Sequence, residues 1–279
     1  MYICDTHTHS NHSPDVPSAR VDSIDALCRA AVSRGVRYLA ITDHYEPDGI
    51  AAGRYAPYPF AAIADEIDAC REKYGDSLYV ALGIEYGEPF NVPDAVLPTL
   101  RAYPYDITLA SLHCIPGKSS FASLDYSRVS IQDAIGLMDR YLDCWDALVA
   151  CSAFDVYTHP TYPLRYLLRA GIPFPTRLWE ERMRASFQTI ISRGAALEYN
   201  TSTMRSPNLG IPDHTAETVL RWYRDCGGEN VTYASDAHDP ADVAAHFTDA
   251  MRILRELGFR YLTVYRQRKP ERLKIDAMI

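Results

Sequence analysis

Histidines and carboxylates recur along this chain at a regular place, just after a short apolar run. His7 and His9 follow the first such run, His44 follows the second, and Glu85 ends the third. The full set is His7, His9, His44, Glu85, His113, His159, Asp236 and His238. Imidazole nitrogen and carboxylate oxygen together suit Zn²⁺, Mn²⁺ or Fe²⁺ better than Ca²⁺ or Cu⁺. The pattern therefore predicts a divalent metal centre.

Two pairs in this set have a spacing that favours a shared ion. His7 and His9 are two residues apart, as are Asp236 and His238. Side chains at i and i+2 of an extended segment point the same way. The whole set exceeds the four ligands of one tetrahedral site, and it suffices for two or three ions if a carboxylate bridges. Closely spaced ions suit phosphoester hydrolysis, because they lower the pKa of a bridging water and neutralise charge on phosphoryl oxygens.

The elements that must position these residues alternate between short apolar runs and amphipathic helices. Alternation of this kind predicts parallel βαβ units. Seven units without a break in composition favour one closed or nearly closed α/β barrel over residues 1–279, and a doubly wound open sheet is the alternative. In a barrel the C-terminal ends of the strands converge on one face, where active sites are built. The predicted strands cover residues 2–6, 36–42, 78–84, 106–112, 154–158, 195–199 and 231–234.

Composition excludes several classes of protein and partner. Of 279 residues, 47% are hydrophobic and 23% are charged, which excludes disorder, collagen-like repeats and coiled coil for the chain as a whole. The net charge of −8 argues against a general nucleic-acid binder, since such proteins carry an excess of basic residues. Seven scattered cysteines without a C-x-x-C pair, no leader-like start and no long apolar run lead us to expect a reduced, cytoplasmic protein without a membrane partner.

The motifs around these residues resemble those of the PHP (polymerase and histidinol phosphatase) superfamily, from residue 2 to about 240. Within the superfamily, the free-standing chain resembles the histidinol-phosphatase branch, on the segment 197–201, Arg165 and Arg205. The resemblance implies a distorted (β/α)7 barrel with a trinuclear metal centre at the C-terminal ends of the strands. The matching motifs are Asp5-Thr6-His7-Thr8-His9-Ser10, Thr42-Asp43-His44, Gly83-Ile84-Glu85, Ser111-Leu112-His113, Thr158-His159-Pro160 and Ser235-Asp236-Ala237-His238.

The resemblance also implies how the ligands divide among the ions. One ion falls to His7, His9, Glu85 and Asp236, and a second to His113, His159 and the bridging Glu85. The third falls to His44 and His238 with Asp15. His12 lies close by in the sequence and competes with Asp15 for that position. For Asp43, a hydrogen bond that orients His44 is favoured over direct metal binding.

Two arginines match the residues that hold the substrate phosphate in the histidinol-phosphatase branch. They are Arg165 and Arg205, and the guanidinium fork suits phosphate bidentately. A surface ion pair is the alternative for each. With Glu85 and Asp236 they form the expected catalytic set, and His44 and His238 are also expected to bind substrate.

The implied activity is metal-dependent hydrolysis of a small phosphomonoester, with L-histidinol phosphate of histidine biosynthesis as the expected substrate. One alternative is a PHP phosphoesterase that acts on another small phosphate ester or on a phosphodiester. The other is a metal-binding module without catalysis. The expected cofactors are two to three ions of zinc, manganese or iron.

Overall fold

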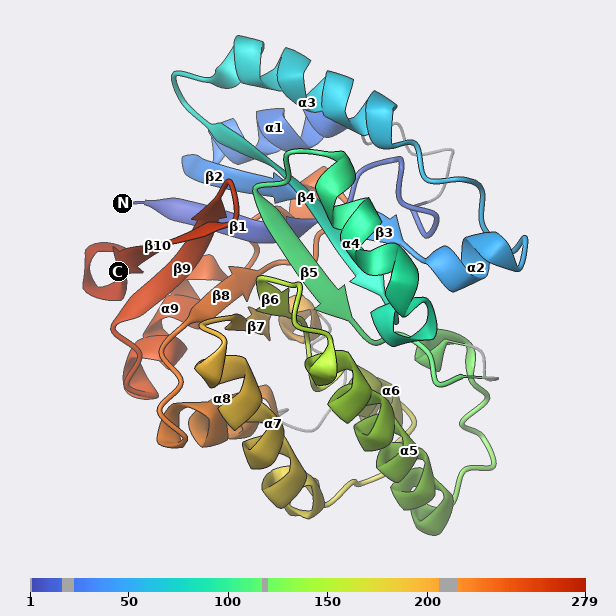
Figure 1. The fold of residues 1–279 in the computed structure, drawn as a ribbon. Coiled ribbons are helices and arrows are strands. Elements are labelled where there is room, and N and C mark those ends of the chain that lie inside the picture. Colours follow the sequence, from blue (N-terminus) through green and yellow to red (C-terminus); the bar gives the residue numbers. More distant parts are fainter. Residues whose placement is uncertain (1, 17–22, 117–119, 206–214) are drawn as a thin grey trace.

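Parallel strands form the centre of the molecule (Figure 1). The computed structural model describes residues 2–16, 23–116, 120–205 and 215–279. Within them, β3 (His44–Tyr45) pairs with the end of β4, beside the main path of the sheet. The main path runs in the order β1 (Ile3–Thr8), β2 (Val36–Ile41), β4 (Tyr79–Gly87), β5 (Ile107–Ser111), β6 (Val156–Tyr157), β7 (Ala196–Asn200) and β8 (Val231–Ala234).

The first and last strands of this path approach each other, so the sheet closes into a nearly complete barrel. Thr8, the last residue of β1, forms a parallel bridge with Ala237, just beyond the end of β8. The amide N–H of His9 donates to the carbonyl of Ala237 at 2.8 Å, and that of Asp236 donates to the carbonyl of His7 at 3.0 Å. The predicted α/β barrel is therefore confirmed, and the open doubly wound sheet is wrong. Closure at this point also brings two pairs of expected ligands together.

Helices pack outside the strands, with α1 and α3 side by side over β1 and β2 (Figure 1). The Ser130 side chain and Asp133 form a capping box at the start of α5. None of the helices in the described residues is long and apolar enough to cross a membrane. The helices are α1 (Ile24–Ser33), α2 (Pro47–Ala51), α3 (Phe60–Tyr74), α4 (Pro93–Ala102), α5 (Ile131–Ala150), α6 (Tyr162–Arg169), α7 (Glu180–Ser192), α8 (Thr215–Asp225) and α9 (Phe247–Glu256).

Two further segments complete the fold. The Pro-rich stretch after β6 contains α6, because Pro163 lies in the first turn, where a missing N–H breaks no helical hydrogen bond. The basic tail forms β10 (Lys269–Lys274), antiparallel to β9 (Tyr261–Arg266). Gln267 and Arg268 both have positive φ, at 49° and 62°, as a tight two-residue hairpin requires.

The β9–β10 hairpin covers the end of the barrel where the strands begin. Figure 1 shows it on the left, beside both chain termini and the start of β1. The Tyr38 hydroxyl donates to the carbonyl of Tyr265 at 2.6 Å, and the Tyr265 hydroxyl donates to the carbonyl of Asp155 at 3.0 Å. With this end covered, the opposite end, formed by the C-terminal ends of the strands, is left for the expected site.

Candidate metal centre

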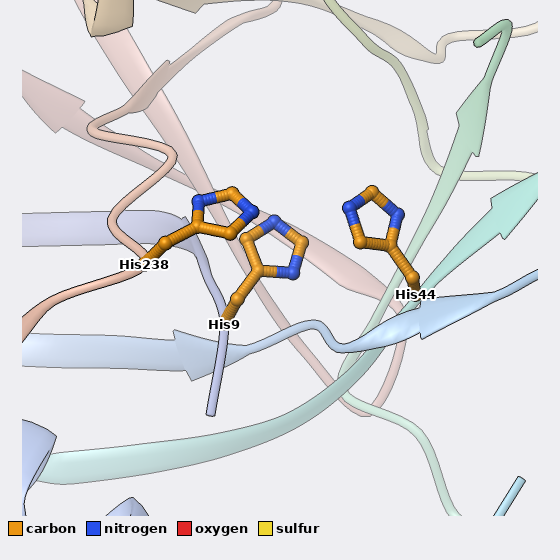
Figure 2. A group of neighbouring side chains, drawn as sticks. All are labelled: His9, His44 and His238. Carbon is orange, nitrogen blue, oxygen red and sulfur yellow. The ribbon is translucent and has the colours of Figure 1, made fainter. Parts of the chain in front are cut away.

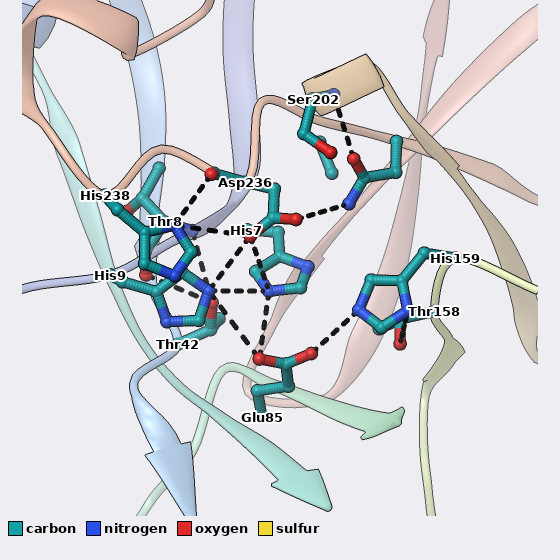
Figure 3. A network of polar contacts seen from close by, with 12 residues as sticks. His7, Thr8, His9, Thr42, Glu85, Thr158, His159, Ser202, Asp236 and His238 are labelled. Atoms are coloured by element: carbon teal, nitrogen blue, oxygen red, sulfur yellow. Dashed lines mark hydrogen bonds and ion pairs between the residues drawn. The ribbon is translucent and has the colours of Figure 1, made fainter. Parts of the chain in front are cut away.

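Glu85 faces several imidazole rings, of which Figure 3 shows those of His7, His9 and His159. Its side chain is fully buried at the end of β4, near the centre of the sheet. Oxygen Oε1 lies 3.1 Å from Nε2 of His113 and 3.0 Å from Nε2 of His159. Oxygen Oε2 lies 2.8 Å from Nδ1 of His44 and 3.3 Å from Nε2 of His7. A carboxylate that faces imidazoles on both sides has the geometry expected of a bridging ligand.

The seam between β1 and β8 contributes the next group. Nε2 of His7 and Nε2 of His9 lie 3.0 Å apart and face the same space. Asp236 Oδ1 lies 3.3 Å from the same nitrogen of His9 and 3.9 Å from that of His7. Asp236 has a left-handed backbone, with φ of 55°, which is uncommon for a residue other than glycine. The turn after β8 therefore holds this carboxylate in a strained conformation beside the histidines.

A third group forms around the ring of His9, which lies between two other imidazoles (Figure 2). Its centroid lies 4.4 Å from that of His44 and 4.1 Å from that of His238. Asp15 Oδ2 lies 2.8 Å from Nε2 of His238 and 3.2 Å from Nε2 of His44. His12 instead pairs with Glu66 on α3 at 2.9 Å. Of the two competitors, Asp15 is thus the one that lies beside the third group.

The residues present fit divalent metal ions. His44 Nδ1 and Glu85 Oε2 are close together but not aligned, so both are buried without a hydrogen-bond partner. Buried polar atoms left in this way are costly unless something else satisfies them. The described residues contain five groups whose possible ligand atoms all lie within 4.8 Å of one another. Three consist only of expected ligands: His7–His9–Glu85, His9–His44–His238 and His44–Glu85–His113.

Burial and neighbouring charges shift the pKa values of these groups, and the direction of the shift differs from one group to the next. Burial, with His238 and His44 nearby, lowers the pKa of His9 to about 3. Burial also acts to lower the pKa of His113, but Glu85 and Glu46 raise it to about 10. The pKa of Glu85 is held well below its usual range by the surrounding histidines, against the effect of burial. Metal ions compete with protons for the same nitrogens, so we expect metal binding to release protons.

A cavity of about 1010 Å³ opens onto the cluster. Arg165 lines it, with the guanidinium 4.7 Å above the ring of Tyr162 and Nη1 3.9 Å from Asp236 Oδ2. The Arg165 Nε is buried without a hydrogen-bond partner. A cation held over an aromatic ring at the wall of this cavity is well placed to receive an anionic group. The expected ligands that line the same cavity are Asp15, His44, Glu85, His113, His159, Asp236 and His238.

Arg205 does not lie where a phosphate-binding residue was expected. Its guanidinium donates to the backbone carbonyls of Ser235 and Asp236, the latter at 3.0 Å, and Nε lies 3.5 Å from Asp242. Each of its three nitrogens thus has a partner within the protein. Arg205 is absent from the described lining of the cavity. The segment that follows it, 206–214, lies outside the described residues.

Asp43 also differs from the expectation. Its carboxylate accepts hydrogen bonds from the backbone N–H of Ser10 at 2.6 Å and from the Ser10 hydroxyl at 2.7 Å. It therefore holds the loop after β1 and does not orient His44 as predicted.

Sequence reasoning missed the carboxylates behind the histidines. Glu198 Oε2 lies 2.8 Å from Nδ1 of His7, and Glu46 Oε1 lies 2.9 Å from Nδ1 of His113. Each contacts the ring nitrogen that faces away from Glu85. The available signal for Glu198 was a charged residue inside an otherwise apolar strand, since such a residue is rarely buried without a partner.

Comparison with known proteins places this geometry in a family. The family model described as "PHP domain" matches residues 5–202. A protein of Deinococcus radiodurans named "Probable histidinol-phosphatase" is 24% identical over 278 residues, which cover 96% of this chain and 98% of that protein. One of Thermotoga maritima with the same name is 25% identical over 262 residues, which cover 94% and 95%.

The fold has a solved counterpart in the histidinol phosphate phosphatase of Lactococcus lactis, determined with zinc, L-histidinol and phosphate. The TM-score is 0.77 at 18% identity, with 96% of this chain and 98% of that chain covered. At this identity the likeness is one of fold. The family match itself runs from the first barrel strand to just beyond the end of β7, and on that ground the chain belongs to the PHP domain family.

Proposed function

We propose that this chain is a metal-dependent phosphomonoesterase that hydrolyses L-histidinol phosphate to L-histidinol and phosphate, as a step of histidine biosynthesis in the cytoplasm. The observation that carries the proposal is the position of Arg165, which lines the same cavity as the cluster around Glu85. The names of the Deinococcus and Thermotoga relatives, which align over nearly the whole chain, support the choice of substrate.

The proposed cofactors are two to three divalent ions of zinc, manganese or iron. When bound, such ions lower the pKa of water and neutralise charge on phosphoryl oxygens. Glu85 is the proposed bridge between two of them, because each of its oxygens faces imidazole nitrogens. The proposed ligands are His7, His9, Asp15, His44, Glu85, His113, His159, Asp236 and His238.

Arg165 is the proposed main contact to the substrate phosphate. The guanidinium of Arg165 lies over the ring of Tyr162, which holds it in place. Its Nη1 lies 3.9 Å from Asp236 Oδ2, so the positive charge lies beside the cluster. A fixed donor of this kind stabilises charge that develops on phosphoryl oxygens during hydrolysis. Arg205 becomes a second contact only if its guanidinium leaves the carbonyls of Ser235 and Asp236.

A panel of substrates tests the proposal. Metal-loaded protein is assayed with histidinol phosphate, nucleoside monophosphates, a phosphodiester and single-stranded DNA. We expect kcat/KM to be highest for histidinol phosphate. Faster hydrolysis of another monoester would reassign the substrate, and a preference for the diester or DNA would indicate a nuclease-like enzyme. No hydrolysis of any substrate by fully loaded protein would indicate a metal-binding module without catalysis.

A further inference from the structure

Strand β7 contributes none of the expected metal ligands, yet two of its side chains contact the ligand cluster. Glu198 and Asn200 are two residues apart, so both point to the same side of the strand. Both are buried, with exposed fractions of 3% and 8%. A buried carboxylate beside a buried amide is costly unless each polar atom has a partner. Their partners explain why they lie there.

Glu198 acts on the orientation of His7. Its Oε2 lies 2.8 Å from Nδ1 of His7, and both side chains are fully buried. An imidazole that donates from Nδ1 leaves the lone pair of Nε2 free, and in His7 that nitrogen is the one that faces His9 and Glu85. The contact with Glu198 therefore selects both the rotation and the tautomer of a predicted metal ligand.

Asn200 joins this carboxylate to a second predicted ligand. The backbone N–H of Ser202 donates to Asn200 Oδ1 at 2.9 Å, which assigns the amide orientation. Asn200 Nδ2 then faces Glu198 Oε1 at 3.0 Å and Asp236 Oδ2 at 3.1 Å. The two N–H bonds of one amide thus serve two carboxylates. Figure 3 shows Ser202 and Asp236 on the side of the network away from Glu85.

The two carboxylate oxygens of Asp236 therefore have different partners. Oδ2 is occupied by Asn200, and Oδ1 lies 3.3 Å from Nε2 of His9. The oxygen on the cluster side is therefore the one presented to an ion. His7 and Asp236 are two of the four ligands expected for the same ion, so the β7 side chains orient half of that ligand set.

We propose that Glu198 and Asn200 are positioning residues that orient His7 and Asp236 and thereby set the affinity for one of the metal ions. The inference rests on the proposed metal centre and is independent of which phosphate ester is the substrate.

The chemistry of the pair explains why an acid and an amide are needed at these two places. Both groups that face Glu198, the His7 ring and the Asn200 amide, are donors, so only a carboxylate satisfies them together. Glutamine at 198 would direct its own NH₂ at one of these donors. Aspartate at 200 would direct an oxygen at the carboxylates of Glu198 and Asp236. The variants Glu198→Gln and Asn200→Asp keep the volume of the side chain and change only which atoms donate and which accept hydrogen bonds.

Metal binding measured without substrate tests the inference. Stripped wild-type protein and the two variants are titrated with Zn²⁺ against a chromophoric chelator. Thr232→Val is the matched control, because Thr232 pairs with Glu198 across β7 and β8 and its buried hydroxyl has no hydrogen-bond partner. We expect both variants to lose about 10- to 100-fold in affinity for one ion, with the other ions and the control near wild type.

A spectroscopic readout separates positioning from a general loss of stability. In Co²⁺-loaded protein, a reoriented His7 or Asp236 alters the visible absorption of the ion, so we expect Asn200→Asp to change the spectrum and Thr232→Val to leave it unchanged. Wild-type affinity and spectrum in both variants would overturn the inference, as would equal losses in the control. Wild-type protein that binds no ion would overturn the metal centre itself, which is a separate result.

Discussion

The two ends of the barrel both bury carboxylates, but they treat them in opposite ways. At the end where the strands begin, Asp106 has a full set of donors. Its Oδ2 accepts from Arg71 at 2.7 Å and from the backbone N–H of Leu82 at 3.0 Å. Its Oδ1 accepts from the Tyr79 hydroxyl at 2.7 Å and from the N–H of Gln267 at 2.9 Å. Every contact there ties one element to another.

Asp155 at the same end is satisfied in a similar way. Arg268 from the hairpin turn donates to both of its oxygens at about 3.0 Å, and the N–H and hydroxyl of Thr108 donate to Oδ2 at 2.9 and 2.8 Å. At the opposite end, Glu85 and His44 retain buried atoms without hydrogen bonds. The two carboxylates at one end of the barrel thus find all their partners within the protein, whereas the groups around Glu85 at the other end leave contacts open for the proposed ions and substrate.

The largest effect is expected at the end of the barrel that holds Glu85. Glu85→Gln removes charge from two ion sites at once, because both carboxylate oxygens face imidazoles. We expect activity to fall by more than about 100-fold, beyond the loss typical of a supporting residue. His12→Ala, whose ring pairs with Glu66 instead, serves as the control and should stay near wild type. Equal losses in the two variants would show that the ligand assignment is wrong.

The next effect concerns the two arginines. Arg165→Ala should cost about 2–4 kcal/mol in kcat/KM with unchanged metal content, since a fixed charge-stabilising donor is lost. Arg165→Lys should recover only part, because a point charge lacks the fork. Arg205→Ala should cost less, because its donors are held by backbone carbonyls. An equal cost for both, with metal content intact in both, would restore the sequence-based expectation that Arg205 also binds phosphate.

A smaller effect is expected at the end of the barrel where the strands begin. Asp155→Asn leaves Arg268, which is about one-third exposed, without its charged partner. We expect a loss of about 1–2 kcal/mol in the free energy of unfolding, with kcat/KM and metal content per folded molecule unchanged. Chemical denaturation and kinetics on the same sample provide the measurement. A drop in kcat/KM of the folded fraction would show that the two ends are coupled.

The smallest effect is a pH dependence of stability in protein stripped of metal by a chelator. The pKa of His113 is raised to about 10, above its ordinary value in an unfolded chain. A raised pKa stabilises the folded protein fully at pH values below the pKa of the unfolded chain, about 6.5. This stabilisation is lost as the pH rises through about 10. The Tm of stripped protein should therefore fall over this window. His113→Gln should flatten that part of the profile, and an unchanged slope would contradict the assignment.

Much of the candidate site could be predicted because it depends on local pattern. Short apolar runs with a His or an acid at their ends define both the strands and the ligands, and parallel strands necessarily bring their C-terminal ends to one face. His7 and His9, or Asp236 and His238, needed only the two-residue period of an extended chain. The barrel and the convergence of these predicted ligands therefore followed from the sequence by itself.

The tertiary structure alone decided the features that depend on partners far apart in the chain. Glu198 contacts His7 across 191 positions, and no local period links them. Asp15 rather than His12 faces the cluster because a loop, not a strand, sets their direction. The same holds for Arg205, whose donors find backbone carbonyls about 30 residues away, and for β10, which has few apolar residues and is ordered by pairing with β9. Local pattern determines which residues reach the end of the barrel, whereas the closure of the barrel determines which of them meet.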